Sequence, residues 1–116
     1  MTTTLYHNPR CSKSRQTLEL LRERGVEPVV IEYLKSPPTK EQLKEALRLL
    51  GIGPRDLLRR SEMEYTAHNL DNPDLDDEAV IEVMLAHPIL IERPIVIHDG
   101  KAVIGRPPER ILEIVP

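Results

Sequence analysis

The chain has 116 residues, of which 40% are hydrophobic and 30% are charged, and its formal net charge at pH 7 is −3. These values are typical of one globular domain, and they exclude a disordered chain and a broad basic surface for nucleic acid or anionic membranes. The only aromatic residues are three tyrosines, so we expect Leu, Ile and Val to build the core.

The N-terminal sequence and the apolar runs predict a cytoplasmic protein. The first thirty residues lack the charged, apolar and small-residue regions of a signal peptide, and no apolar run approaches the ~20 residues that span a bilayer. A single cysteine, Cys11, cannot form an internal disulfide, which fits a reducing compartment. Any redox cycle through Cys11 therefore needs a second thiol from another molecule.

The first part of the chain predicts a β-α-β unit. Residues 3–6 favour a strand that ends before Asn8-Pro9, and from Ser12 the leucines follow a helical period as far as the stop signal Gly25-Val26. Residues 29–34 are β-branched or aromatic at most positions and predict a second strand. The handedness rule makes this unit a right-handed parallel crossover.

The middle of the chain is predicted to be helical. Thr39 and Gln42 form a capping box for a helix that ends at Gly51, and a short helix is expected over residues 54–60. A further helix begins after Asp76 and runs to about Ala86, whereas residues 61–75 are polar and irregular.

The last part of the chain predicts a hairpin and a short helix. Residues 95–98 and 101–104 flank Asp99-Gly100, a strong turn signal, and the terminal helix begins near Pro107-Pro108 with Ile111, Leu112 and Ile114 facing inward. The order βαβ, helices, ββα predicts a thioredoxin-like α/β fold, in which a mixed four-stranded sheet has helices on both faces. We expect one domain, residues 1–116, with a helical insertion at about residues 39–91.

Cys11 is the strongest candidate for chemistry. It lies where a strand passes into a helix, so backbone N–H groups and the helix dipole favour its thiolate, and Arg10, Lys13 and Arg15 add positive charge. A free cysteine is often only a small buried hydrophobe, but these polar neighbours favour a nucleophile.

Two neighbours of Cys11 each allow two interpretations. Ser14 holds the fourth position of a CxxC-like motif, so it either donates a hydrogen bond to the thiolate or satisfies local backbone groups. His7 either tunes the thiol or is structural. The phosphatase pattern Cys-x5-Arg fails at Thr17, and neither zinc-ligand spacing nor a nucleotide-binding fingerprint is present.

Four ordered segments carry a family resemblance: Tyr6–Arg15, Tyr33–Thr39, Leu57–Arg59 and His87–Val96. Together they resemble the glutaredoxin-coupled arsenate reductase family over nearly the whole chain. The resemblance implies a thioredoxin-like fold, Cys11 as nucleophile with His7 near it, and a cis peptide bond before Pro94. It also implies three oxyanion ligands: Arg59, Arg93 and Arg106.

The implied reaction is reduction of arsenate, or of a similar oxyanion, without a bound cofactor. The Cys11 thiolate attacks arsenic, glutathione attacks the thiolated arsenic, and glutaredoxin supplies reducing equivalents before arsenite leaves. The chain ends at Pro116, soon after its last predicted helix, which is typical of a shorter branch of the family.

Three other functions are open at this point. One is a general glutathione-linked thiol oxidoreductase that uses the same activated Cys11. Another is a redox-responsive regulator that binds RNA polymerase, although such regulators typically switch through a CxxC pair, which Ser14 breaks. The third is a purely structural interaction module, which the position of the only cysteine disfavours.

Overall fold

Both ends of the chain contribute strands to a mixed sheet. The structure is a computed structural model that describes residues 2–116. The strand order is β2-β1-β3-β4, and the strands are β1 (Thr3–His7), β2 (Val29–Glu32), β3 (Ile95–His98) and β4 (Lys101–Ile104). β1 is parallel to β2 and antiparallel to β3, and β3 is antiparallel to β4. The predicted mixed four-stranded sheet is confirmed.

The strand register brings three chain segments to one edge of the sheet. Tyr6 near the end of β1 pairs with Ile95 at the start of β3, and Ile95 pairs with Ile104 at the end of β4. Because β3 runs against both neighbours, the loop after β1, the residues before β3 and the residues after β4 all lie at this edge.

The helix after β1 follows its prediction closely. α1 spans Ser12–Glu23, and Gly25 takes a positive φ of 79° just after it, while the Val26 N–H donates to the Leu21 carbonyl at 2.9 Å. This helix stop is the one expected of a C-terminal glycine with an apolar residue after it. The fully buried Leu21 joins a core contributed by several elements: Leu5, Val96, Val103, Ile111 and Val115.

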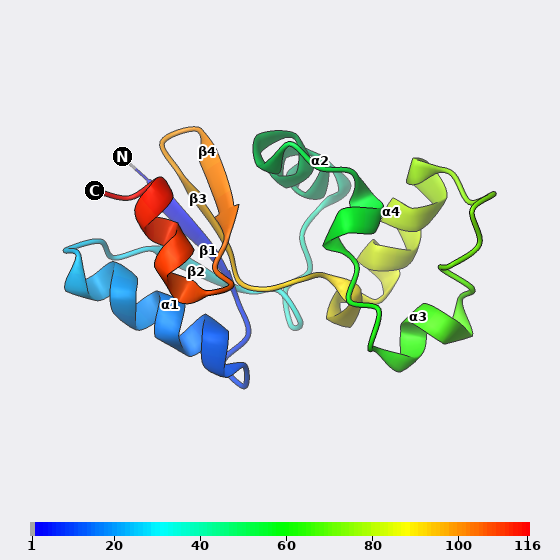
Figure 1. Cartoon of the computed structure of the whole chain (residues 1–116), viewed down its shortest axis with the longest axis horizontal. Coiled ribbons are helices and arrows are strands. Elements are labelled where there is room, and N and C mark those ends of the chain that lie inside the picture. Colours follow the sequence, from blue (N-terminus) through cyan, green and yellow to red (C-terminus); the bar gives the residue numbers. More distant parts are fainter. Residues whose placement is uncertain (1) are drawn as a thin grey trace. The chain divides into compact units, whose positions relative to one another are not determined.

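The C-terminal helix differs from its prediction in one residue. It is a 3-10 helix, η3 (Pro108–Glu113), which lies beside α1 and also contacts β4 (Figure 1). Ile111 is buried as predicted, but Leu112 is 42% exposed, so its predicted inward orientation is wrong. In the tighter 3-10 turn, residues 111 and 112 cannot share one face.

The second strand is shorter than predicted. β2 ends at Glu32, because the Glu32 carbonyl accepts hydrogen bonds from the N–H groups of Lys35 and Ser36, both at 2.9 Å. Residues 33 and 34 therefore belong to a turn rather than to the strand.

Residues 37–92 contain the remaining helices: α2 (Lys40–Leu50), η1 (Pro54–Leu57), α3 (Met63–Ala67), α4 (Asp77–Ala86) and η2 (Pro88–Leu90). The capping box of Thr39 and Gln42 is present, and Asp76 accepts from the Ala79 N–H. Two expectations were wrong: the helix after Gly53 ends at Leu57, and the polar stretch 61–75 contains α3. Arg55 organises that stretch by donating to the carbonyls of Leu70, Asn72 and Leu75.

The chain divides into two compact units. The sheet unit comprises the residues up to Ser36 together with Arg93–Pro116, and the helical unit is Pro37–Glu92 (Figure 1). This division lies close to the predicted insertion, whose status within a single domain stays a prediction. Within residues 2–116, none of the helices combines the length and the apolar character needed to cross a membrane.

Candidate active site

Cys11 lies at the N-terminus of α1 in a tightly bonded loop. It is the N-cap residue, its N–H donates to the Asn8 carbonyl, and its own carbonyl accepts from Arg15 N–H, both at 3.0 Å. The Asn8 side chain accepts from the Arg10 N–H at 3.0 Å, which fixes the loop further. The first turn of α1 contains no acidic residue. The sulfur is therefore held where helix N–H groups favour a negative charge.

The pKa of the Cys11 thiol is lowered. Burial is the largest single influence and raises the pKa, but it is outweighed by the Ser14 N–H, by hydrogen bonding and positive charge from Arg93, and by the Lys13 N–H. The backbone N–H groups at the N-terminus of α1 were predicted to favour the thiolate, and the contributions of the Ser14 and Lys13 N–H groups agree with that prediction. The predicted source of side-chain charge was wrong, because Arg93 supplies it rather than Arg10, Lys13 or Arg15.

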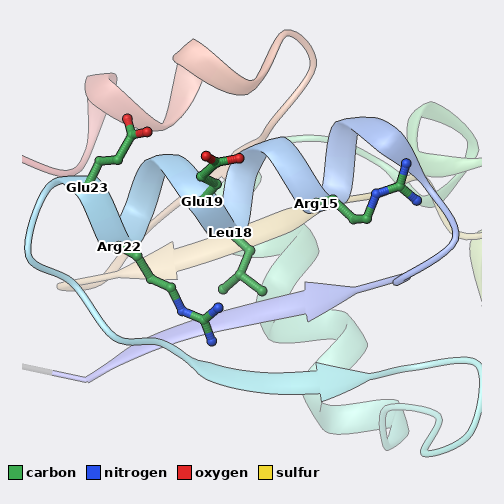
Figure 2. Close-up of a pocket in the computed structure, with 5 residues that line it drawn as sticks. All are labelled: Arg15, Leu18, Glu19, Arg22 and Glu23. Atoms are coloured by element: carbon green, nitrogen blue, oxygen red, sulfur yellow. The ribbon is translucent and has the colours of Figure 1, made fainter.

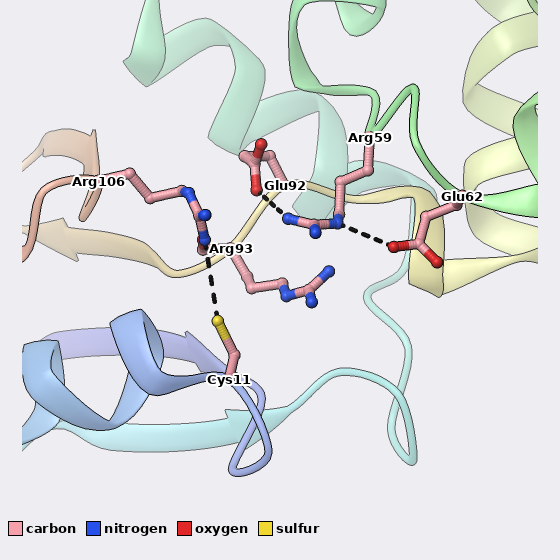
Figure 3. A network of polar contacts seen from close by, with 6 residues as sticks. All are labelled: Cys11, Arg59, Glu62, Glu92, Arg93 and Arg106. Carbon is pink, nitrogen blue, oxygen red and sulfur yellow. Dashed lines mark hydrogen bonds and ion pairs between the residues drawn. The ribbon is translucent and has the colours of Figure 1, made fainter.

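Two of the predicted arginines reach Cys11 within the sheet unit. Arg93 precedes β3 and Arg106 follows β4, so both lie at the sheet edge that carries Cys11. The Arg106 Nη1 lies 3.8 Å from the Cys11 Sγ, a long contact, and 3.3 Å from the Arg93 carbonyl (Figure 3). Nε and Nη1 of Arg93 are buried. The peptide bond between Arg93 and Pro94 is cis, and so is the bond between Arg106 and Pro107.

Gly105 is a site residue that sequence analysis missed. Its N–H donates to the Pro94 carbonyl at 2.9 Å, and a Cβ added there would lie 2.6 Å from Thr17 Oγ1 and 2.9 Å from Pro94 Cγ. The close approach of α1 and the Pro94 segment leaves room only for glycine. A glycine at the end of a predicted strand was the available signal.

His7 and Ser14 form a buried pair beneath the loop. His7 Nδ1 lies 2.7 Å from Ser14 Oγ, which also accepts from the Asn8 N–H at 3.0 Å. The Ser14 hydroxyl thus contacts His7 and the backbone. The Ser14 backbone N–H is the group of this residue that lowers the pKa of the thiol, and a hydrogen bond from the hydroxyl to the thiolate stays a prediction. Burial is the main cause that lowers the pKa of His7, partly opposed by Glu32, with Arg22 and Arg15 lowering it further.

Arg59 belongs to the helical unit and is held there by two carboxylates. A backbone bridge joins Leu58 to Ile91, with Arg59 N–H donating to the Leu90 carbonyl and Glu92 N–H to the Leu57 carbonyl, both at 2.8 Å. The Arg59 Nη1 lies 2.6 Å from Glu92 Oε1, and its Nε lies 3.3 Å from Glu62 Oε2 (Figure 3). Neither glutamate was expected from the sequence as a partner of Arg59. The role of Arg59 as an oxyanion ligand stays a prediction.

Neither a metal-ligand cluster in residues 2–116 nor the cavity along α1 provides a further site. Residues 2–116 contain no group of three or more His, Cys, Asp or Glu that could hold a metal ion. A cavity of about 530 Å³ lies along α1, lined by Arg15, Leu18, Glu19, Arg22 and Glu23 (Figure 2). Its arginines are already bonded, Arg15 to the Pro9 carbonyl and Arg22 to Glu27. This cavity therefore lacks the convergent polar groups of a ligand site.

Comparisons with known proteins agree on one family. The model of the ArsC family matches residues 6–114. The protein YfgD of Escherichia coli (strain K12) is 53% identical over 112 residues, covering 96% of this chain and 94% of its own. An arsenate reductase of Neisseria meningitidis (serogroup A, strain Z2491) is 46% identical, covering 92% of each chain. The solved structure of an arsenate reductase from Vibrio cholerae has a TM-score of 0.95 and 48% identity, covering 98% of each chain.

Proposed function

Because this chain belongs to the ArsC family, we propose that it reduces arsenate to arsenite with the Cys11 thiolate as the nucleophile. The observation that carries the proposal is the lowered pKa of Cys11 beside Arg93 and Arg106 at one edge of the sheet. A thiolate is the reactive form of cysteine, and the family relatives named above include an arsenate reductase.

The two arginines supply what an oxyanion requires. Arsenate carries charge on several oxygens, and a guanidinium presents planar donors that can contact two oxygens at once. The same Arg93 charge that lowers the pKa of Cys11 would also attract the anion toward the sulfur. Arg59 is proposed as a third ligand on the basis of the family resemblance.

The first chemical step forms a sulfur–arsenic bond. The Cys11 thiolate attacks As(V), an arsenic–oxygen bond breaks, and the oxygen leaves as water after it takes up protons. A glutathione thiol then displaces a second oxygen as water and forms another sulfur–arsenic bond. The chain's single cysteine is sufficient for these steps, because every further thiol comes from another molecule.

Reduction follows when glutaredoxin attacks the glutathione sulfur. The arsenic–sulfur bond breaks, its electron pair stays on arsenic, and As(V) becomes As(III), while glutaredoxin and glutathione form a mixed disulfide. Water then displaces the Cys11 thiolate and arsenite leaves. The proposed reaction thus requires arsenate, glutathione and glutaredoxin, and it needs no bound cofactor.

The test is arsenate-dependent oxidation of NADPH in the presence of glutathione, glutaredoxin and glutathione reductase. Cys11→Ser should remove turnover altogether, and Arg93→Ala should lower kcat/KM by roughly 100-fold, as the loss of a preorganised charged donor does elsewhere. Arg24→Ala is the matched control, since Arg24 is exposed at the opposite end of α1, and it should retain full turnover.

A lack of arsenate turnover would favour the alternative enzyme, a glutathione-linked thiol oxidoreductase. If the native protein shows no arsenate turnover while its Cys11 reacts rapidly with disulfides, arsenate reduction is excluded. The same thiolate would then serve a glutathione-linked thiol oxidoreductase, which needs no oxyanion ligands.

A further inference from the structure

A cavity of about 270 Å³ adjoins the loop that carries Cys11. Its walls come from the ends of two strands of the sheet unit and the residues that follow them: His7, Asn8, Pro9 and Arg10 at the end of β1, and Glu32, Leu34 and Lys35 at the end of β2. Because His7 and Glu32 are register partners in parallel strands, both segments leave the sheet at the same edge. The volume is close to the lower limit of small-molecule pockets, roughly 300 Å³.

The cavity combines an apolar wall with two cations. Leu34 is 40% exposed, and Pro9 is also exposed. Arg10 and Lys35 are both exposed and carry positive charge. The one carboxylate in the wall, Glu32, lies 3.7 Å from the Lys35 Nζ, an exposed pair that a ligand anion can readily replace.

The cavity shares its loop with the nucleophile but not its anion ligands. Arg10 directly precedes Cys11, and the Cys11 N–H is bonded to the Asn8 carbonyl. Arg93 and Arg106, which act on the sulfur, are not part of its wall. It therefore suits a molecule that binds beside the Cys11 loop and is not the oxyanion itself.

We propose that this cavity binds the carboxylate-bearing part of the small thiol that attacks the arsenic on Cys11, with glutathione as that thiol; the inference rests on the proposed function. Glutathione has two carboxylates for Arg10 and Lys35, and its methylene groups fit against Leu34 and Pro9. Its bound thiol forms the second sulfur–arsenic bond as an oxygen leaves as water. The cavity thus confers selectivity for a charged thiol over a neutral one.

The first experiment measures KM for glutathione and for arsenate separately. Arg10→Gln and Lys35→Gln should each raise the KM for glutathione roughly threefold, and the double variant roughly tenfold, which is the scale of partly solvated ion pairs. The KM for arsenate should stay unchanged. With 2-mercaptoethanol as the thiol, which has no carboxylate, the variants should match the native protein.

Two charge-matched controls lie away from the cavity. Arg24 is at the far end of α1, and Lys101 pairs with His98 beside the hairpin turn, at the opposite edge of the sheet. Arg24→Gln and Lys101→Gln should leave both KM values unchanged. Glu32→Gln should lower the KM for glutathione, because it removes the carboxylate that competes for Lys35.

A second experiment does not depend on arsenate. The Cys11 thiolate attacks oxidised glutathione, forms a mixed disulfide and releases one glutathione thiolate, and mass spectrometry follows the rate. The double variant should react roughly tenfold more slowly than native protein with oxidised glutathione, but equally fast with bis(2-hydroxyethyl) disulfide. This comparison separates recognition of the carboxylates from any change in the thiol itself.

The outcomes separate the two proposals. Normal arsenate turnover with an unchanged KM for glutathione in the double variant overturns the cavity inference and leaves the reductase proposal standing. Absence of arsenate turnover, with the disulfide rates still dependent on Arg10 and Lys35, overturns the reductase proposal and keeps the cavity as a glutathione site.

Discussion

The sheet unit holds two of the arginines predicted to bind the oxyanion, Arg93 and Arg106, and the helical unit holds Arg59. Arg93 and Arg59 have different surroundings. In the sheet unit, Arg93 acts on a thiol and lowers its pKa. In the helical unit, the charge of Arg59 is compensated by Glu62 and Glu92. The same residue type thus activates a nucleophile in one unit and is held in an ion-pair cluster in the other. The affinity of each arginine for an anion therefore depends on the carboxylates and thiols that surround it.

The largest expected effect tests the sheet side of this comparison. Because Cys11 has a lowered pKa, its alkylation by iodoacetamide should show a pH midpoint below that of the same thiol in the unfolded chain. Arg93→Ala removes a group that stabilises the thiolate, so the midpoint should move to higher pH and the rate at pH 7 should fall. Arg93→Lys should keep part of the effect, since the charge remains without the planar fork.

Arg59→Ala completes that experiment. Its charge is already compensated by two glutamates, so we expect the alkylation midpoint to stay at the native value. If the alkylation midpoint shifted in Arg59→Ala but not in Arg93→Ala, Arg59 rather than Arg93 would be the arginine that acts on the thiol.

The next effect concerns the close packing that places Arg106. Gly105→Ala puts a methyl group within 3 Å of Thr17 and Pro94, and overpacking of this kind costs about 1–3 kcal/mol of unfolding free energy. Urea denaturation should show the loss, together with a lower arsenate turnover. The control lies in the helical unit: Gly53→Ala, where the new Cβ meets nothing closer than 4.0 Å and φ is −86°, should change stability little. Equal stability of the two variants would contradict the packing at Gly105.

Local sequence signals predicted several helix ends and one turn. The glycine stop of α1, the capping box at Thr39 and the Asp99-Gly100 turn act within a few residues, so they can be recognised without the fold. The lowered pKa of Cys11 was also expected, because the sulfur lies at a helix N-terminus.

Contacts between distant residues could not be predicted in this way. The positive charge that helps to lower the pKa of Cys11 comes from Arg93, 82 positions away in the chain. In the same way, Arg59 pairs with Glu92, which is distant in sequence. The Ser14 hydroxyl could have turned to several neighbours, and only the position of His7 decides which. The short α3 has no apolar period to predict it, since none of its residues is buried.

A smaller effect should be confined to the helical unit. Arg55 donates to three backbone carbonyls in residues 70–75, and Arg55→Gln should lower the free energy of unfolding by about 1–2 kcal/mol through the loss of charged hydrogen bonds. Iodoacetamide reactivity of Cys11 should not change. Arg60→Gln is the matched control, because Arg60 is an exposed neighbour on the same segment. A change in thiol reactivity on Arg55→Gln would show that the two units are not independent in this respect.

The smallest effect decides whether the compensated charge of Arg59 serves the reaction. Glu92→Gln keeps the size of the side chain and an oxygen that can accept from Arg59, but it removes one negative charge. If Arg59 binds the oxyanion, less competition from this carboxylate should lower the KM for arsenate about twofold to fivefold, the scale of a partly exposed ion pair, with kcat unchanged. If Arg59 only holds the bridge between Leu58 and Ile91, the KM should not fall, and only the free energy of unfolding should drop. Steady-state kinetics over a range of arsenate concentrations, combined with urea denaturation, distinguishes these two roles.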